Sequence, residues 1–191
     1  MADAAHGLEA IAAATARDRL LIAAHRRRGE DMGAAPDKVA ALLDTARALD
    51  TIGAPWALIG GVAVSIHSGV PRATMDTNIA VPSTIDRRRV TQALTDAGFR
   101  FIGEFRHSAN FRHPGGEPVQ LVFDPGFDPM IERAERFQVA AVSVPIVRKT
   151  DLIAMKERAA ADPARRRSKA LRDQADVALL RGDVPDPDEG W

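Results

Sequence analysis

The 191-residue chain contains no cysteine. Without thiols it can form no disulfide scaffold, no thiolate metal site and no cysteine nucleophile. It also lacks any apolar stretch approaching the ~18–20 residues that a membrane-spanning helix needs. Its N-terminus has no basic start followed by a long apolar segment, so we expect no secretion signal. These absences favour a cytoplasmic protein that makes no membrane contact.

The chain has no net charge, because 26 lysines and arginines balance 26 aspartates and glutamates. Bulk charge therefore gives no argument for or against a nucleic-acid partner. Apolar residues make up 46% and charged residues 27% of the sequence, the usual mixture for a globular protein. A chain of this length can bury a sizeable core without the help of disulfides or metal ions.

Hydrophobic spacing and turn residues divide the sequence into four parts. Residues 1–35 are predicted to form an N-terminal helical extension, with a helix over 7–28. Residues 36–147 are predicted to form the core, and 148–181 a pair of helices that pack on it. Residues 182–191 form an acidic, proline-rich tail.

Strands and helices mix in the predicted core without strict β–α–β alternation. This pattern favours an α+β fold, a mixed β-sheet with flanking helices and a C-terminal helical pair. Helices are expected over residues 37–49, 62–68, 84–97, 129–136, 150–161 and 165–180, and strands over 56–59, 76–81, 99–103, 105–111, 118–123 and 139–147. Four phenylalanines near the expected strands are predicted to pack in the core and across strands, not to stack on bases. They are Phe99, Phe101, Phe105 and Phe111.

A glycine pair, Gly60 and Gly61, separates the apolar run 56–59 from the expected helix that follows. Glycines permit a sharp turn and a close backbone approach. The N-terminus of a helix offers free N–H groups and the positive end of its dipole to a phosphate. A glycine pair alone is nevertheless more often a plain turn than a phosphate site.

Asp76 and Asn78 stand at alternate positions of an expected strand and so share a face, roughly 6.5–7 Å apart along the chain. Two oxygen-bearing side chains in this arrangement can share one Mg²⁺, which takes hard oxygen ligands together with substrate phosphates. Just before them, Arg72 and Thr74 can donate hydrogen bonds to triphosphate oxygens. The alternative interpretation is that these two residues anchor the loop.

The two closing helices carry charged residues on faces that are expected to pack. Lys156 lies on the apolar stripe of its helix, so its ammonium group needs a route to water or an anionic partner. Asp173 and Asp176 are neighbours on one helix face. The alternative for these two carboxylates is surface pairing with Arg172 or Arg166.

Taken together and in order, these segments resemble the signature of the polymerase-β-like nucleotidyltransferases, and most closely the AbiEii-type toxins with their MenT branch. The resemblance covers roughly residues 36–181. It is carried by Gly60-Gly61, by Arg72-Ala-Thr-Met-Asp76-Thr-Asn78, and by Lys156 followed by Arg172-Asp173-Gln-Ala-Asp176.

The resemblance implies a polymerase-β-like fold and a metal-dependent enzyme that transfers a nucleotide from a nucleoside triphosphate (NTP) to an acceptor. The implied metal is Mg²⁺ or Mn²⁺. In the toxin branch the acceptor can be the 3′ end of tRNA, and an antitoxin restrains the enzyme. The implied site residues are, for catalysis, Asp76, Lys156 and Asp173; for nucleotide binding, Gly60, Gly61, Arg72, Thr74 and Lys156; and for the metal, Asp76 and Asn78.

Two positions depart from the family pattern. Asn78 stands where a second aspartate is usual, and Gln120 stands where a later strand often supplies a third carboxylate. The chain is therefore either an enzyme that works with fewer carboxylates, a natural pseudoenzyme, or a toxin inactivated by an introduced Asp→Asn change at 78. The second hypothesis for function is accordingly a non-catalytic module that binds nucleotide, RNA or a partner protein. A protein-modifying transferase is a third.

Overall fold

The computed structural model describes residues 37–72, 74–139 and 142–184. The predicted N-terminal extension, with its helix, and residues 185–191 of the predicted tail lie outside these ranges. The described part contains seven strands, six α-helices and one 3₁₀ turn. They are α2 (Lys38–Thr51), β1 (Ala57–Ile59), α3 (Gly60–Ser68), β2 (Thr77–Ala80), α4 (Arg87–Asp96), β3 (Arg100–Phe105), β4 (Ser108–Arg112), β5 (Pro118–Val122), η1 (Pro125–Phe127), α5 (Asp128–Glu132), β6 (Glu135–Val139), β7 (Val142–Ile146), α6 (Lys149–Ala161) and α7 (Arg167–Leu180).

Local capping chemistry fixes where two of the core helices begin. The Asp37 carboxylate accepts hydrogen bonds from the backbone N–H groups of Val39 and Ala40, at 3.0 and 3.1 Å, directly before α2. Asp86 does the same for the first turn of α4. An aspartate at this position satisfies N–H groups that have no partner within the helix. The predicted helix start at Asp37 is confirmed.

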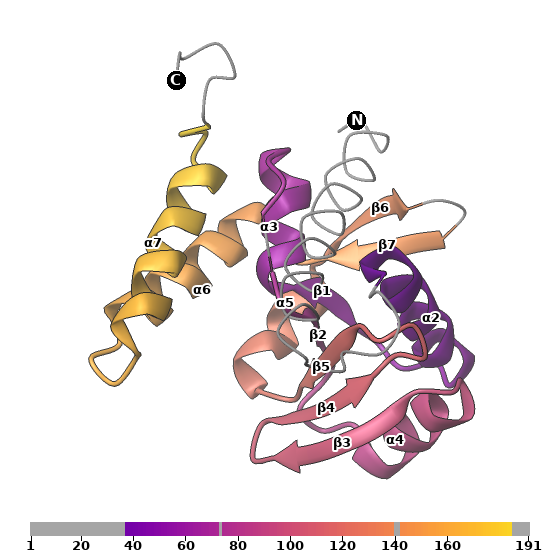
Figure 1. Cartoon of the computed structure of the whole chain (residues 1–191). Coiled ribbons are helices and arrows are strands. Elements are labelled where there is room, and N and C mark those ends of the chain that lie inside the picture. Colours follow the sequence, from indigo (N-terminus) through magenta and orange to yellow (C-terminus); the bar gives the residue numbers. More distant parts are fainter. Residues whose placement is uncertain (1–36, 73, 140–141, 185–191) are drawn as a thin grey trace, which may run out of the picture.

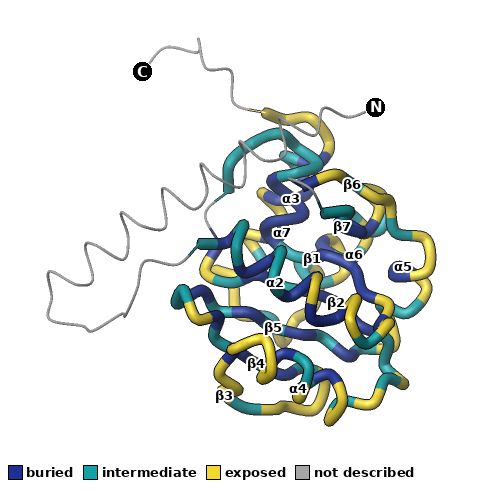
Figure 2. The backbone as a smooth tube through the Cα atoms, turned by 90° about the vertical axis from the view of Figure 1, so that its right-hand side faces the viewer, coloured by how far each residue is buried: buried dark blue, intermediate teal, exposed yellow. Residues whose placement is uncertain are grey.

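The strands form one mixed sheet in the order β3-β4-β5-β2-β1-β7-β6. At its centre β1 runs antiparallel to β2 and parallel to β7, while β2 runs parallel to β5. Helices α2 and α4 pack against each other and against strands of the sheet, and α6 and α7 lie side by side next to α3 (Figure 1). Burial is concentrated in the central strands, whereas the outer strands β3 and β6 are largely exposed (Figure 2). The predicted α+β class is confirmed.

The strand boundaries around two hairpins differ from the prediction. The strands predicted over 99–103 and 105–111 correspond to β3 and β4, but the turn between them lies later, because β3 ends at Phe105 and β4 begins at Ser108. The strand predicted over 139–147 contains β7, but its antiparallel partner β6, which ends at Val139, was not predicted. The helix predicted to reach residue 136 ends at Glu132. Neither hairpin is marked by glycine or proline between its strands, so no local signal revealed the turns.

The predicted packing of the four phenylalanines is correct only in part. Phe99 and Phe111 are each 2% exposed, and Phe101 lies edge-on against Phe111 with the ring centroids 5.5 Å apart. Phe105, however, is 62% exposed. The prediction is wrong for Phe105 because β3 is the outermost strand on its side of the sheet. Among the described helices, none is long and apolar enough to cross a membrane.

Candidate active site

Asp76 and Asn78 lie at the beginning of β2, in the middle of the sheet. Asn78 is in register with Ile59 on β1 and with Gln120 on β5. Residues paired across strands point to the same face, so the side chains of Asn78 and Gln120 are neighbours. Asp76 precedes Asn78 by two residues and lies in the bend that leads into β2. The structure thus brings together the one carboxylate and the two amides that the sequence singled out.

The amides continue as a row onto the next strand. Gln120 Nε2 donates a hydrogen bond of 3.0 Å to Asn110 Oδ1, and these two residues are in register on β5 and β4. Asn78, Gln120 and Asn110 therefore lie side by side on three adjacent strands. Where the resemblance leads one to expect carboxylates, the sheet carries neutral side chains that keep an oxygen but no negative charge. Asn110 had not been identified from the sequence.

Helix α3 begins at the glycine pair itself, two residues earlier than predicted. Gly60 has a positive φ of 73°, a conformation that favours glycine. A Cβ atom at Gly60 would lie 3.0 Å from Asn78 Nδ2, and a Cβ atom at Gly61 would lie 2.8 Å from Thr74 Cβ and also against the Arg72 guanidinium. Both glycines are thus required because the first turn of α3 lies directly against the loop and strand that carry these three side chains.

We expect Gly61→Ala to weaken NTP binding by roughly tenfold, because forcing a methyl group into a filled space typically costs about 1–3 kcal/mol. The added carbon would displace Arg72 and Thr74 from the start of α3. Isothermal titration calorimetry with each NTP would measure the loss. Gly103→Ala is the control, because no atom lies within 4 Å of a Cβ at that position. Equal affinities in both variants would show that the close packing at Gly61 is not needed for binding.

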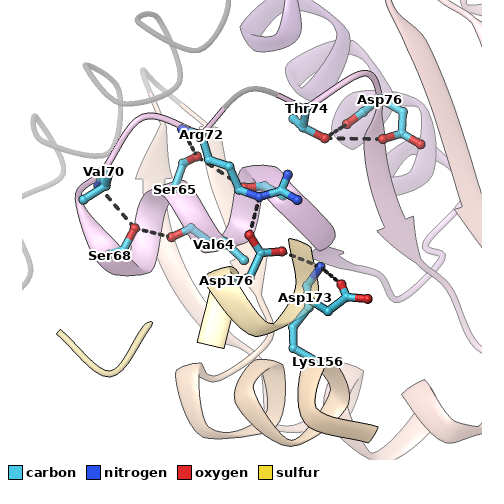
Figure 3. A network of polar contacts seen from close by, with 11 residues as sticks. Val64, Ser65, Ser68, Val70, Arg72, Thr74, Asp76, Lys156, Asp173 and Asp176 are labelled. Carbon is cyan, nitrogen blue, oxygen red and sulfur yellow. Dashed lines mark hydrogen bonds and ion pairs between the residues drawn. The ribbon is translucent and has the colours of Figure 1, made fainter. Parts of the chain in front are cut away.

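The loop before β2 is held back against α3 by its own hydrogen bonds (Figure 3). The backbone N–H of Arg72 donates to Ser65 Oγ at 3.1 Å. Thr74 Oγ1 donates to the backbone oxygen of Asp76 at 3.3 Å and lies 3.4 Å from its Oδ1. These bonds show that the loop is anchored, as the alternative interpretation proposed. They also place the Arg72 guanidinium and the Thr74 hydroxyl beside the first turn of α3.

A chain of alternating charges joins this loop to the two C-terminal helices. Lys156 Nζ on α6 lies 2.8 Å from Asp173 Oδ1 and 2.8 Å from Asp176 Oδ2 on α7. Asp176 in turn accepts a hydrogen bond from Arg72 Nε, as Figure 3 shows. Asp173 accepts one from Arg165 Nε at 2.6 Å. Lys156 is 8% exposed and its two carboxylate partners 2% and 1%, so the network is buried.

The network answers two questions that the sequence left open. The buried Lys156 ammonium has two anionic partners. The alternative of surface pairing with Arg172 or Arg166 is wrong, because Asp173 and Asp176 are buried and pair instead with Lys156, Arg165 and Arg72. Asp176 contacts Arg72 across 104 positions of sequence. The spacing of three residues between the aspartates was a usable signal that they share one helix face. No local signal pointed to Arg72 or Arg165 as their partners.

The electrostatics keep Asp173 ionised. Burial alone would raise the pKa of the Asp173 carboxyl, but hydrogen bonds and charges from Lys156 and Arg165 outweigh it and hold the pKa below its ordinary value of 3.8. The carboxylate therefore carries its charge at neutral pH. Such a fixed negative charge keeps the ammonium of Lys156 in place between the helices.

The oxygen donors around Asp76 determine what kind of metal site the chain can form. Asp76 offers a carboxylate and Asn78 an amide oxygen, and the Nδ2 of Asn78 is turned toward Gly60. Within residues 37–72, 74–139 and 142–184, no group of three acidic or histidine side chains is arranged to hold a metal. Mg²⁺ is commonly bound through one or two carboxylates together with substrate phosphates. The residues therefore fit a single Mg²⁺ or Mn²⁺ that arrives with a triphosphate, and not a metal held by protein ligands alone.

Comparison with known proteins places this arrangement in a family. The family model described as "Nucleotidyl transferase AbiEii toxin, Type IV TA system" matches residues 41–189. That range contains all the candidate residues described above. No curated protein matches the sequence at a significant level.

Several solved structures share the fold. An antigenic nucleotidyltransferase-like protein from Paracoccidioides brasiliensis is 22% identical, with a TM-score of 0.53 over 79% of this chain and 78% of that one. ANT(2″)-Ia in complex with adenylyl-2″-tobramycin is 16% identical, with a TM-score of 0.54 over 78% and 91%. The lincosamide antibiotic adenylyltransferase LnuA is 14% identical, with a TM-score of 0.51 over 71% and 91%. These likenesses confirm the predicted polymerase-β-like nucleotidyltransferase fold.

Proposed function

Because the chain belongs to the AbiEii nucleotidyl transferase toxin family of type IV toxin–antitoxin systems, we propose that it transfers a nucleotide from an NTP to the 3′ hydroxyl of an RNA, with tRNA as the first candidate. The observation that carries the proposal is the convergence of three separate segments at the start of α3. The glycine pair, the loop with Arg72 and Thr74, and the beginning of β2 meet there. Family membership also implies an antitoxin partner, and we propose the cytoplasm as the site of action.

In this proposal the triphosphate lies at the N-terminal end of α3. Gly60 and Gly61 form the first turn of α3, whose N–H groups have no partner within the helix, and the helix dipole favours negative charge at this end. The Arg72 guanidinium and the Thr74 hydroxyl add side-chain donors beside Gly61. Asp76 and the Asn78 amide oxygen would hold one Mg²⁺ or Mn²⁺, which, when bound, offsets negative charge on the phosphates.

The transfer step is a substitution at phosphorus. The oxygen of the acceptor hydroxyl attacks the α-phosphorus of the NTP and forms a new P–O bond. The bond from the α-phosphorus to the oxygen bridging it to the β-phosphate breaks, and pyrophosphate leaves. Asn78 and Gln120 are amides and cannot take up the hydroxyl proton. We assign that role to the carboxylate of Asp76.

We assign Lys156 and Asp173 an indirect role, in which they position Arg72. The contact between Lys156 and the triphosphate that the family resemblance implies stays a prediction. Its ammonium group lies between Asp173 and Asp176, and Asp176 binds Arg72. We propose that Asp173 holds Lys156, and that Lys156 and Asp176 together hold the Arg72 guanidinium at the phosphate site.

The second candidate function is a non-catalytic module that binds nucleotide or RNA. The row of amides at Asn78, Gln120 and Asn110 favours it, because these side chains do not supply the negative charge that a divalent ion prefers. The two candidate functions differ in whether a nucleotide is transferred from the NTP to an acceptor. They do not differ in whether an NTP is bound.

The test of the proposed function is transfer of label from each of the four α-labelled NTPs to total tRNA, with Mg²⁺ or Mn²⁺. We expect transfer by the chain as it stands and a loss of at least about 100-fold in Asp76→Asn, since the lost charge is worth roughly 3 kcal/mol or more. Asp183→Asn is the matched control, because that carboxylate is exposed beyond the end of α7. Binding of NTP without transfer to any acceptor would instead support the binding module.

A further inference from the structure

One face of the half-sheet formed by β2, β5, β4 and β3 is contacted by α3 at Asn78 on β2, while α2 and α4 pack on the other face. Along β4 and β5 burial alternates strictly, with each buried residue flanked by half-buried ones. The buried set, which includes Ala109 and Leu121, faces the core beneath α2 and α4. We call the opposite side the open face. By register, its side chains include Asn78, Pro118, Gln120, Val122, Ser108, Asn110, Arg112, Arg100 and Phe105, and Asp76 directly precedes β2.

Two arginines on the open face are in line with Asp76. Arg100 is in register with Arg112, and Arg112 with Pro118. β2 begins at Thr77, which is paired with Val119, so Asp76 lies just before the strand at the end of the sheet where Pro118 begins β5. With neighbouring strands about 4.8 Å apart, Arg112 lies roughly 10 Å and Arg100 roughly 14 Å from Asp76 along a single row.

The charge of this row is not neutralised within the described part of the chain. Neither Arg100 nor Arg112 forms an ion pair with a carboxylate of residues 37–72, 74–139 or 142–184. Arg112 Nη1 donates to the backbone oxygen of Gly116 at 2.9 Å, which fixes the side chain and leaves further donors of its guanidinium. The carboxylate of Asp124, beyond the far end of β5, does not neutralise this row: its Oδ1 accepts a hydrogen bond of 2.8 Å from the backbone N–H of Gly126.

An aromatic ring completes the face. Phe105 is paired with Ser108 at the outer end of the hairpin and is 62% exposed. Phe105 lies on the same face as Arg100 but five residues farther along β3, roughly 16 Å away. Exposed rings together with guanidinium groups are the combination with which proteins hold single-stranded nucleic acids, because bases stack on the ring and phosphates contact the arginines. A protein-binding surface is expected to have a more apolar centre than this row of amides provides.

We propose that the open face holds the single-stranded 3′ end of the acceptor RNA, a site that rests on the proposed transfer reaction. The NTP occupies the α3 side of Asp76, so the attacking hydroxyl must approach from the opposite side, where β5 and β4 lie. Phosphates near the 3′ end contact Arg112 and then Arg100. An upstream base stacks on Phe105, and the terminal hydroxyl lies at Asp76.

The experiment measures binding of a short 5′-fluorescein-labelled single-stranded RNA by fluorescence anisotropy over a range of salt concentrations. In Arg100→Ala/Arg112→Ala we expect the affinity to fall at least about tenfold and the slope of log K against log salt to fall by roughly 1.4, that is about 0.7 for each lost phosphate contact. Phe105→Ala should weaken binding by about tenfold with the slope unchanged. The blunt duplex of the same sequence should bind more weakly than the single strand.

The control variant is Arg88→Ala/Arg158→Ala, which removes the same charge from exposed positions on α4 and α6. Equal RNA affinities in the two double variants, or no RNA binding by the unaltered chain, would overturn the proposal. So would a change of oligomeric state in Arg100→Ala/Arg112→Ala, which would make the open face a protein contact. NTP binding is measured separately and should be unchanged in that variant. If the unaltered chain binds no NTP, the proposed function fails. The anisotropy measurement would still test whether the open face binds single-stranded RNA.

Discussion

Restoring a carboxylate at position 78 is expected to raise the rate of nucleotide transfer by about 10²–10³-fold. Two unit charges 4 Å apart interact by about 4 kcal/mol at an effective dielectric constant of 20, and a divalent ion doubles that gross figure. Desolvation offsets much of the gain, but a remainder of roughly 3–4 kcal/mol corresponds to this change in rate. Asparagine and aspartate have nearly the same shape, so Asn78→Asp leaves the packing against Gly60 in place.

Initial rates of label transfer at saturating NTP and RNA would measure this gain. The matched control is Asn110→Asp, which adds the same charge to the same face two strands farther from β1. A charge at that distance, roughly 10 Å from position 78, is weakened by distance and by salt, so we expect a change of less than about tenfold. If Asn78→Asp binds NTP but transfers no label, the charge at 78 does not limit the reaction, and the binding module becomes the better account.

The sequence predicted those parts of the fold that local chemistry determines. The start of α2 followed from the capping carboxylate of Asp37, whose partners lie two and three residues away. The position of the turn between β3 and β4 could not be predicted in the same way. The turn, at Arg106 and His107, lacks the usual turn residues, and the pairing of Phe105 with Ser108 depends on the neighbouring strands.

The residues of the candidate site likewise fall into those that local sequence identifies and those that only the fold brings together. The glycine pair, Asp76 and Asn78 could be selected because their spacing alone suggests phosphate and metal binding. The amide row needed the register of three strands, since Asn78, Gln120 and Asn110 are widely separated in sequence. The contact between Arg72 and Asp176 depends on how α7 packs on α3, which no pattern within either segment specifies.

The buried network makes Lys156 a position where a single change should cost much stability. We expect Lys156→Met to lower the free energy of unfolding by about 3–5 kcal/mol at neutral pH, because it leaves two buried carboxylates short of a counter-charge. Methionine keeps much of the volume of the side chain, so the loss is electrostatic rather than one of packing. Urea denaturation followed by circular dichroism would measure it. Lys149→Met, at an exposed position of the same helix, should change stability by no more than about 0.5 kcal/mol.

The pH dependence of this loss separates the charge network from a general packing defect. The pKa of Asp173 is lowered in the folded protein, so its stabilising contribution is complete above the ordinary value of 3.8 and is lost as the pH falls through the lowered value. Lys156 is one cause of that lowering, and the difference between Lys156→Met and the unaltered chain should therefore shrink below pH 4. Adding Asp173→Leu to Lys156→Met should recover part of the loss at neutral pH, since Arg165 is one-third exposed and can turn to water. A loss of the same size at pH 3 and pH 7, with no recovery in the double variant, would show that Lys156 stabilises the helices by packing and not by its charge.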